Sequence, residues 1–142
     1  MARVLGVDYG ERRIGLAVSD PSGTIAQPLP TLTRRRGKRP PVQTVAGTAL
    51  EWQAAAVVVG LPLTLAGDES DWTREARAFG EKVAERAGIP VHFVDERMTS
   101  VRAEHAVRSL GLRRVQREDK SRIDAAAAVL ILQAYLDLAG RG

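Results

Sequence analysis

The sequence predicts an α/β fold in which a mixed five-stranded sheet carries helices on both faces. The N-terminal third contains three strand-like segments separated by turns, which predicts an antiparallel meander. The remainder alternates helical patterns with short apolar segments typical of parallel strands covered on both faces. With 142 residues and a hydrophobic content of 44%, the chain is long enough for one core, so we expect a single domain over residues 1–142.

Two turns define the predicted meander. Residues 3–8 and 13–19 form apolar segments joined by a short polar turn. The sequence Asp20-Pro21-Ser22-Gly23 is a second turn signal, and a third strand follows it over residues 24–32. Two prolines in this third strand place its end at a sheet edge or make it irregular.

Helices and parallel strands alternate in the rest of the chain. The helical pattern at 71–87 ends before Gly88, a residue type that favours the left-handed conformation at a helix end. The apolar segments 55–59 and 91–94 predict two buried parallel strands. The other predicted segments are a basic loop at 34–41, a helix at 41–53, a loop at 63–68, a helix at 99–110, a basic loop at 111–120 and a last helix at 123–138.

Three acidic residues lie beside apolar segments, where burial penalises a charge. Asp8 ends the first strand, Glu96 follows the last strand, and Asp124 opens the final apolar helix. The first strand is central in a sheet of this order, so all three acids can approach one sheet edge. Converging carboxylates repel one another unless they are protonated or bound to metal. They therefore indicate a divalent metal site, and two ions about 4 Å apart would suit phosphoryl transfer.

Each acid also has a structural explanation. Asp8 can simply start a turn, because Asp favours such positions. Glu96 can pair with Arg97 or with Arg102 on the next helix. Asp95 also competes with Glu96 for the site role, because alternation along a strand puts only one of the two on a given face. The segment from Ser121 to Asp124 fits a capping box, and an acid in the first turn of a helix complements the helix dipole. The sequence leaves these alternatives open.

The chain carries excess positive charge in two clusters. Lys and Arg number 21 against 17 Asp and Glu, a formal net charge of +4. The clusters, at 34–39 and 97–122, indicate a polyanionic partner, although each also suits a solvated face. The chain has no cysteine, no pattern of a secretory signal, and no apolar stretch long enough to span a bilayer. We therefore expect a cytoplasmic protein without a membrane partner.

Five motifs follow one another along almost the whole chain. They are Gly6-Val7-Asp8-Tyr9-Gly10, the segment from Arg13 to Asp20, Gly60-Leu61-Pro62, Asp95-Glu96-Arg97-Met98-Thr99, and the segment from Lys120 to Ala127. Through these motifs the sequence resembles the YqgF/RuvX family. The resemblance implies an RNase H-like fold related to the Holliday-junction resolvases of the RuvC type. It also implies a nuclease, described either as processing the 5′ end of pre-16S rRNA or as resolving four-way DNA junctions.

Carried over residue by residue, the resemblance assigns roles to individual side chains. It implies that Asp8, Glu96 and Asp124 are catalytic and ligate Mg²⁺ or Mn²⁺, with two ions expected. The nucleic-acid contacts that we expect are Arg13 and Arg97, which would orient carboxylates or phosphate, Lys120 and Arg122, which would face the scissile phosphate, and Arg34, Arg35 and Arg36 in the basic loop.

The leading hypothesis is a metal-dependent nuclease that acts on structured RNA, above all the 5′ end of pre-16S rRNA. The first alternative is a Holliday junction resolvase, which needs two active sites and hence a dimer. The core needs all the apolar helix faces, so we expect a monomer or a weak homodimer. A further alternative is a non-catalytic RNA-binding assembly factor. An actin-like phosphate loop around Asp8 ranks low, because the chain has no room for the second domain that such proteins need.

Overall fold

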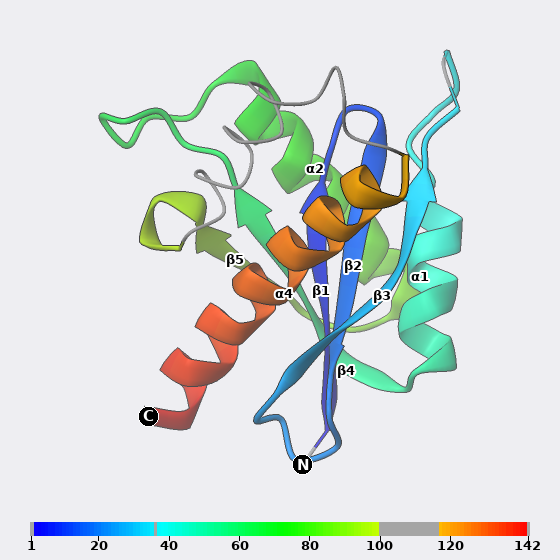
Figure 1. The fold of residues 1–142 in the computed structure, drawn as a ribbon, viewed down its shortest axis with the longest axis vertical. Helices are drawn as coiled ribbons and strands as arrows, with labels where there is room; N and C mark the ends of the chain where they lie inside the picture. Colours follow the sequence, from blue (N-terminus) through cyan, green and yellow to red (C-terminus); the bar gives the residue numbers. More distant parts are fainter. Residues whose placement is uncertain (1, 36, 100–116, 142) are drawn as a thin grey trace.

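The sheet contains five strands in the order β3-β2-β1-β4-β5 (Figure 1). The computed structural model describes residues 2–35, 37–99 and 117–141, and the side chains of these residues except 117–124 and 141. Strands β1, β2 and β3 are antiparallel neighbours, whereas β4 and β5 add in parallel beside β1. The predicted meander with two parallel strands is therefore confirmed. The strands are β1 Arg3–Tyr9, β2 Arg13–Ser19, β3 Ala26–Thr33, β4 Ala54–Leu61 and β5 Val91–Asp95.

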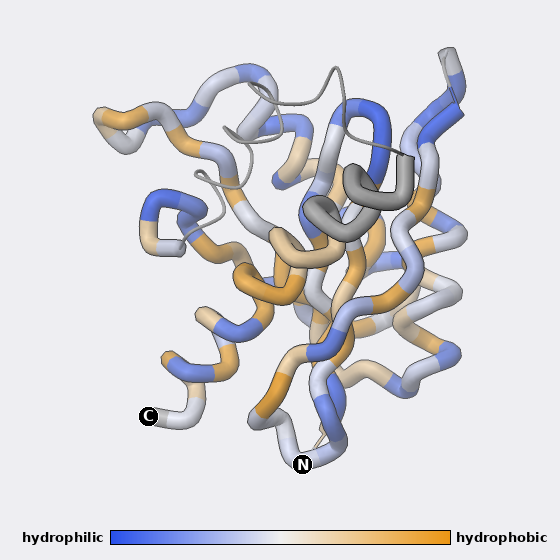
Figure 2. The backbone as a smooth tube through the Cα atoms, viewed as in Figure 1, coloured by the Kyte–Doolittle hydropathy of each residue, from blue (hydrophilic) through white to orange (hydrophobic). Residues whose placement is uncertain are grey.

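Helices cover both faces of this sheet, as predicted. Helices α1 (Val42–Glu51) and α2 (Asp71–Ala87) pack on one face, and α4 (Arg117–Arg141) crosses the other (Figure 1). A short 3₁₀ helix, η1 (Glu96–Met98), follows β5. Two apolar clusters fill the two interfaces, and Figure 2 shows hydrophobic residues along the central strands and along the middle of α4. No helix within the described part of the chain is long and apolar enough to cross a membrane.

Local sequence explains where α2 begins and ends. The Ser70 side chain accepts a hydrogen bond from the Thr73 backbone amide at 3.2 Å, and the Thr73 hydroxyl accepts one from the Ser70 amide at 3.1 Å. This reciprocal pair is a capping box, which satisfies two amides that the first helical turn leaves without partners. Gly88 ends the helix with φ of 71°, as its residue type predicts. The predicted bounds of this helix are confirmed.

Three sequence-based expectations are corrected. The sequence predicts a buried strand at 91–94, but β5 is an edge strand and His92 is exposed, because an apolar segment fits an edge that one helix covers equally well. The third strand begins at Ala26, since the Asp20 carboxylate accepts hydrogen bonds from the amides of Thr24 and Ile25. Helix α4 begins at Arg117 and not at residue 123.

The early start of α4 also removes one structural explanation of Asp124. A residue four positions inside a helix is not its N-cap, so Ser121 does not cap α4 and the predicted capping box is wrong. Charged residues such as those at 117–122 are good helix formers, and their polarity does not make a loop. The helix predicted at 99–110, apart from Thr99, and residues 111–116 of the predicted basic loop lie outside the described residues.

Candidate active site at the carboxyl edge of the sheet

Asp8 lies on the face of the sheet that α4 covers. Leu5 and Val7 of the same strand belong to the apolar cluster under α1 and α2, whereas Gly6 faces α4. Alternation along the strand therefore turns Asp8 toward α4 as well. Its cross-strand partner on β2 is Gly15, which has no side chain to fill the space beside it. Asp8 is only 2% exposed, so the strand presents a buried acid near its carboxyl end.

Glu96 reaches the same face from the end of β5. The parallel register pairs Val7 with Val59. The next residues, Asp8 and Gly60, therefore lie level with each other. The Oε1 atom of Glu96 lies 2.9 Å from the position that a Cβ atom would take on Gly60, and Glu96 is 4% exposed. The two buried carboxylates therefore lie on the same face of the sheet, at the level of Gly60.

Helix α4 approaches this pair closely through another glycine. A Cβ atom on Gly6 would lie 2.7 Å from Cβ of Leu132 and 3.2 Å from the carbonyl oxygen of Ala128. Position 124 is one helical turn before Ala128 and therefore shares its helix face. The C-terminal end of β1 and the N-terminal end of α4 both lie toward the upper edge of the sheet in Figure 1. The backbone thus brings position 124 toward Asp8, while the side chain of Asp124 lies outside those described.

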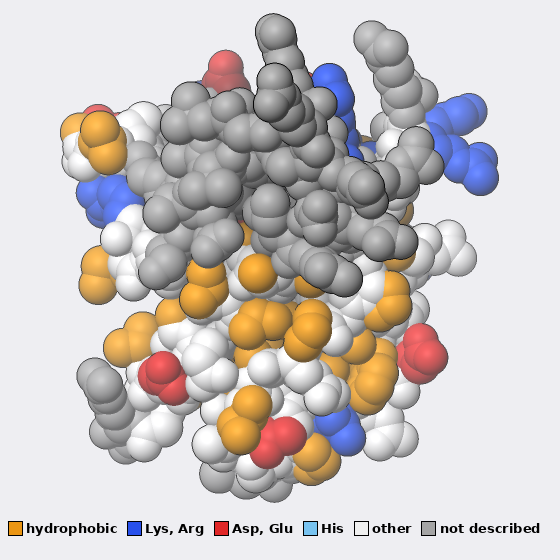
Figure 3. All heavy atoms as spheres, viewed as in Figure 1, with side chains coloured by type: hydrophobic (Ala, Val, Ile, Leu, Met, Phe, Trp, Pro, Cys, Tyr) orange, Lys and Arg blue, Asp and Glu red, His pale blue; other side chains and the backbone are white. Residues whose placement is uncertain are grey.

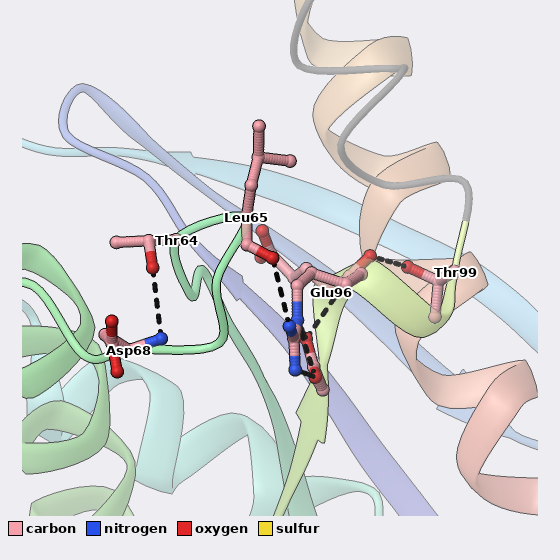
Figure 4. Close-up of polar contacts among 7 residues, drawn as sticks. Thr64, Leu65, Asp68, Glu96 and Thr99 are labelled. Carbon is pink, nitrogen blue, oxygen red and sulfur yellow. Dashed lines mark hydrogen bonds and ion pairs between the residues drawn. The ribbon is translucent and has the colours of Figure 1, made fainter.

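Asp95 and Glu96 turn to different partners, which decides between the two candidates. The Asp95 carboxylate accepts hydrogen bonds from Arg97, from Nε at 3.0 and 3.1 Å and from a terminal nitrogen at 2.7 Å. Asp95 also accepts from the Arg97 amide at 2.9 Å and so caps η1. Figure 4 shows Glu96 at the end of β5, where its backbone carbonyl accepts a hydrogen bond from the Thr99 hydroxyl at 3.1 Å. Glu96 is the acid on the Asp8 face.

The predicted nucleic-acid contacts do not all gather at this edge. Arg13 starts β2 on the same face as Asp8, because the next residue, Ile14, belongs to the opposite cluster. Arg34 donates to the carbonyl of Gly10 at 2.9 Å and lies 5.0 Å from the ring centroid of Tyr9, so its guanidinium braces the β1–β2 turn. Arg35 is exposed, and Arg36 lies outside the described residues. Lys120 and Arg122 lie in the first turns of α4, and their side chains are outside those described.

Comparison with known proteins identifies the family. A family model described as "RuvX: Holliday junction resolvase" matches residues 2–138. The chain belongs to the RuvX family. The resemblance seen in the sequence is therefore confirmed.

Curated relatives agree with this membership. A protein of Anaeromyxobacter sp. (strain Fw109-5), described as "Putative pre-16S rRNA nuclease", is 42% identical over 135 residues, which is 95% of this chain and 96% of the relative. A Koribacter versatilis relative with the same description is 42% identical over 138 residues, 97% of this chain and 88% of the relative. The match thus extends over nearly the whole length of both chains.

Solved structures support the predicted RNase H-like fold. Thermus thermophilus RuvC in complex with a Holliday junction substrate superposes with a TM-score of 0.60 at 20% identity, over 99% of this chain and 97% of that one. A second RuvC structure from T. thermophilus gives a TM-score of 0.54 at 21% identity, over 97% and 96% of the two chains. At such low identity the likeness concerns the fold.

The described side chains include two acids that could hold a metal ion. Asp8 and Glu96 offer buried carboxylate oxygens on one face of the sheet, and Mg²⁺ and Mn²⁺ prefer such ligands. No group of three or more His, Cys, Asp or Glu occurs among the described side chains in an arrangement that could hold a metal ion. Asp124, one turn before Ala128 in α4, has the chemistry of a third ligand, and its side chain lies outside those described. The chemistry of these donors fits a hard divalent cation.

Sequence reasoning missed the glycines that make room for this site. Gly60 stands inside an otherwise apolar strand, a signal that indicates a close approach of another group to the backbone. Gly15 and Gly6 give the same signal on β2 and β1. Sequence reasoning predicted the loop at 63–68 but missed its contact with Arg97.

Proposed function

We propose that this RuvX-family protein is a divalent-metal-dependent nuclease whose catalytic residues are Asp8, Glu96 and Asp124. One observation carries the proposal. The buried carboxylates of Asp8, on β1, and Glu96, directly after β5, lie on one face of the sheet at the level of Gly60, in a chain whose relatives are described as nucleases. Buried negative charge of this kind weakens the binding of phosphate unless a cation is present, so it favours metal-assisted cleavage over simple RNA binding.

The proposed division of labour follows from position. The three carboxylates would hold Mg²⁺ or Mn²⁺, two ions in the full site. The bound cations would neutralise charge on the scissile phosphate and lower the pKa of the attacking water. Arg13, on the same face at the start of β2, would orient a carboxylate or a phosphate oxygen. Lys120 and Arg122, early in α4, would approach the phosphate from the other side of the site.

We further propose that the substrate is structured RNA, and in particular the 5′ end of pre-16S rRNA. Support comes from the description shared by the full-length relatives. The basic residues near the site would add affinity that falls with salt. On the face of the molecule drawn in Figure 3, most of the visible Lys and Arg side chains lie in the upper half. This is the half in which β1 ends and α4 begins in Figure 1. The protein would act in the cytoplasm, where this RNA is made.

A four-way DNA junction is the second candidate, because the matching family model is described as a Holliday junction resolvase. Paired incisions need two active sites, so this interpretation requires a dimer under assay conditions. Sedimentation velocity at working concentration measures whether the protein is a monomer or a dimer, and together with the cleavage assays this distinguishes the two candidate substrates. A strictly monomeric protein that cuts RNA supports the first, and a dimer that cuts junctions in pairs supports the second.

The deciding experiment compares the wild type with Asp8→Asn, and Asp137→Asn is the matched control at the exposed far end of α4. Labelled precursor rRNA and a four-way junction are each incubated with Mg²⁺, Mn²⁺ or chelator. We expect cutting that requires metal, is lost in Asp8→Asn and persists in Asp137→Asn. Binding without metal-dependent cutting would favour an RNA-binding assembly factor. An active Asp8→Asn protein would refute the proposed site.

A second readout does not depend on activity. A cation that binds only the folded state stabilises it by RT ln(1 + [L]/Kd), or about 2.7 kcal/mol at 100 times Kd. Adding Mn²⁺ should therefore raise the melting temperature of the wild type and of Asp137→Asn. In Asp8→Asn the shift should be much smaller, because one carboxylate ligand is gone. Equal shifts in all three proteins would show that the cation binds elsewhere.

A further inference from the structure

Several internal hydrogen bonds hold the loop of residues 62–69 together. Within it, the Thr64 amide donates to the Asp68 carbonyl at 2.9 Å and the Gly67 amide donates to the Thr64 carbonyl at 2.9 Å. The Asp68 amide donates to the Thr64 hydroxyl at 3.0 Å (Figure 4). These bonds close a small internal turn around Gly67, whose φ of 92° suits glycine. The loop therefore has one defined backbone conformation.

Both ends of the loop are tied to α2. The Thr73 hydroxyl donates to the Pro62 carbonyl at 2.7 Å, at a position that is fully buried. Arg77 forms an ion pair with Glu69 at 2.8 Å and a second hydrogen bond from Nε at 2.9 Å. These contacts fix where the loop leaves β4 and where it enters α2.

Arg97 ties the middle of the loop to the end of β5. One of its terminal nitrogens donates to the Leu65 carbonyl at 3.3 Å. The same nitrogen lies 2.9 Å from the position that a Cβ atom would take on Gly67. The other side of the guanidinium is bonded to the Asp95 carboxylate. Arg97 thus joins two segments that are 32 residues apart, directly beside Glu96.

These contacts oppose a direct role for Arg97 in binding phosphate. Hydrogen bonds from Arg97 to Asp95 raise the pKa of Arg97, so the side chain stays charged, yet the pair with Asp95 has no net charge. To bind a phosphate through two guanidinium N–H groups, Arg97 would have to break its hydrogen bonds to Asp95 and to the Leu65 carbonyl. A group bonded on both edges is better suited to hold protein segments in place.

The tip of the loop exposes two apolar side chains, while Thr64, Asp68 and Glu69 are its exposed polar residues. Leu65 is 80% exposed, and its side chain points away from Asp68 and Glu96 (Figure 4). Ala66 is also exposed, and residues 62–69 include no Lys or Arg. Such a surface cannot attract phosphate, but it can make van der Waals contact with a sugar or a base. A rigid contact of this kind costs little ordering entropy on binding.

We propose that Arg97 is a positioning residue that fixes the loop of residues 62–69 beside Glu96, and that the loop forms a preformed apolar wall for the nucleic-acid strand, with Leu65 as its contact to a sugar or base. This inference rests on the proposed nuclease function, and it replaces the phosphate-binding role that the sequence suggests for Arg97. It also explains why an exposed loop is so strongly cross-linked.

Three variants and three measurements test the wall. Arg97→Gln removes the clamp, that is, the hydrogen bonds by which Arg97 joins Asp95 to the Leu65 carbonyl. Leu65→Ser removes only the apolar contact. The control, Arg86→Gln, removes one exposed positive charge at the far end of α2. The measurements are amide hydrogen exchange in residues 62–69, the salt dependence of RNA binding, and KM and kcat for cleavage of precursor rRNA. Melting temperatures verify that each variant is folded.

We expect Arg97→Gln to speed exchange of the loop amides by about tenfold or more. It should also raise KM by about tenfold with kcat within roughly twofold, because the wall binds the ground state and the transition state equally. Arg97→Lys should not rescue these effects, because an ammonium group cannot bond Asp95 and Leu65 together. Leu65→Ser should raise KM in the same way and leave exchange unchanged. Arg86→Gln should leave both KM and loop exchange as in the wild type.

Two results would overturn the inference. Unchanged exchange in Arg97→Gln, with a salt slope reduced by roughly 0.7–0.9 as for the removal of one phosphate ligand, would make Arg97 a phosphate-binding residue. A KM in Leu65→Ser equal to that of the wild type would remove the wall. Hydrogen exchange needs no nuclease activity, so it still decides the clamp if the wild type does not cut. In that case the nuclease proposal fails separately, and Kd for RNA replaces KM in testing Leu65.

Discussion

A methyl group added at Gly60 would enter the space between the candidate active site and α4. The added Cβ atom would lie 2.5 Å from Cδ1 and 3.0 Å from Cγ1 of Ile131, and 2.9 Å from Oε1 of Glu96. Carbon atoms in good contact are about 3.5–4.0 Å apart, so Ile131 would have to move by roughly 1 Å. The Glu96 carboxylate would have to move by several tenths of an ångström. Gly60→Ala therefore perturbs packing and the site together.

The two effects have different magnitudes. Overpacking of a buried position costs about 1–3 kcal/mol, and we expect Gly60→Ala to lower the free energy of unfolding by that amount. A misplacement approaching 1 Å in a catalytic group can cost about 10²-fold in rate, so we expect cleavage to fall by roughly 10–100-fold. Urea denaturation measures the first quantity, and single-turnover cleavage with saturating protein measures the second.

A second substitution separates packing from positioning. Ile131→Val removes Cδ1, the atom in closest conflict with the new methyl group, but it does not touch the contact with Glu96. The double variant Gly60→Ala, Ile131→Val should therefore regain part of the lost stability and little of the lost activity. Gly47→Ala is the matched control, because Gly47 is exposed in α1 with nothing within 4 Å of its Cβ position. It should raise the free energy of unfolding by about 0.5–1 kcal/mol.

Full activity in Gly60→Ala would refute this reasoning, because the carboxylate of Glu96 would then be free to shift without consequence. Recovery of activity in step with stability in the double variant would also contradict it, since the loss would then come from packing alone.

Three further predictions concern the scaffold. Gly6→Ala places a Cβ atom 2.7 Å from Cβ of Leu132, so it should lower the free energy of unfolding by about 1–3 kcal/mol in urea denaturation. Ser70→Ala removes the cap of α2 and should cost about 1 kcal/mol in the same assay; a loss below about 0.2 kcal/mol would contradict the cap. Hydrogen bonds, first from Ser22, lower the pKa of Asp20 to about 2 from 3.8. Since the folded pKa is the lower one, this stabilisation is present above pH 3.8 and is lost toward pH 2. The difference in melting temperature between the wild type and Asp20→Asn should therefore shrink over that range.

The directions of the strands and the central place of β1 could be predicted from the sequence, because turns, prolines and apolar segments are local signals. The sequence could not show that β5 lies at the edge, since an apolar segment suits either a central strand or an edge under a helix. The contact of Arg97 with the loop could not be predicted from the sequence either, because its partner Leu65 is 32 residues away and contributes a backbone carbonyl. Backbone acceptors are the same for every residue type, so no pattern of side chains reveals them.

Placement of the carboxylates and approach of the helix depend on one shared feature. Gly15 is paired with Asp8, Gly60 lies level with it on the other side, and Gly6 precedes it on the same face. Three missing side chains on three neighbouring strands leave space at the centre of a sheet face that would otherwise be filled with apolar groups. Helix α4 uses part of that space to approach β1 at Gly6, and Glu96 uses another part at Gly60.

This arrangement explains how buried acids are compatible with a stable core. Ala17 and Val58, which pair with Gly6, keep the same face apolar farther from the edge, so the sheet does not depend on the acidic end for its packing. The carboxylates of Asp8 and Glu96 can then remain in a space whose size is set by glycines and in which a cation would offset their charge. If that is correct, filling the space from the protein side, as in Gly60→Ala, should weaken the stabilisation by Mn²⁺ as well as cleavage. A variant that loses cleavage but keeps the full Mn²⁺ shift would place the cation away from Gly60.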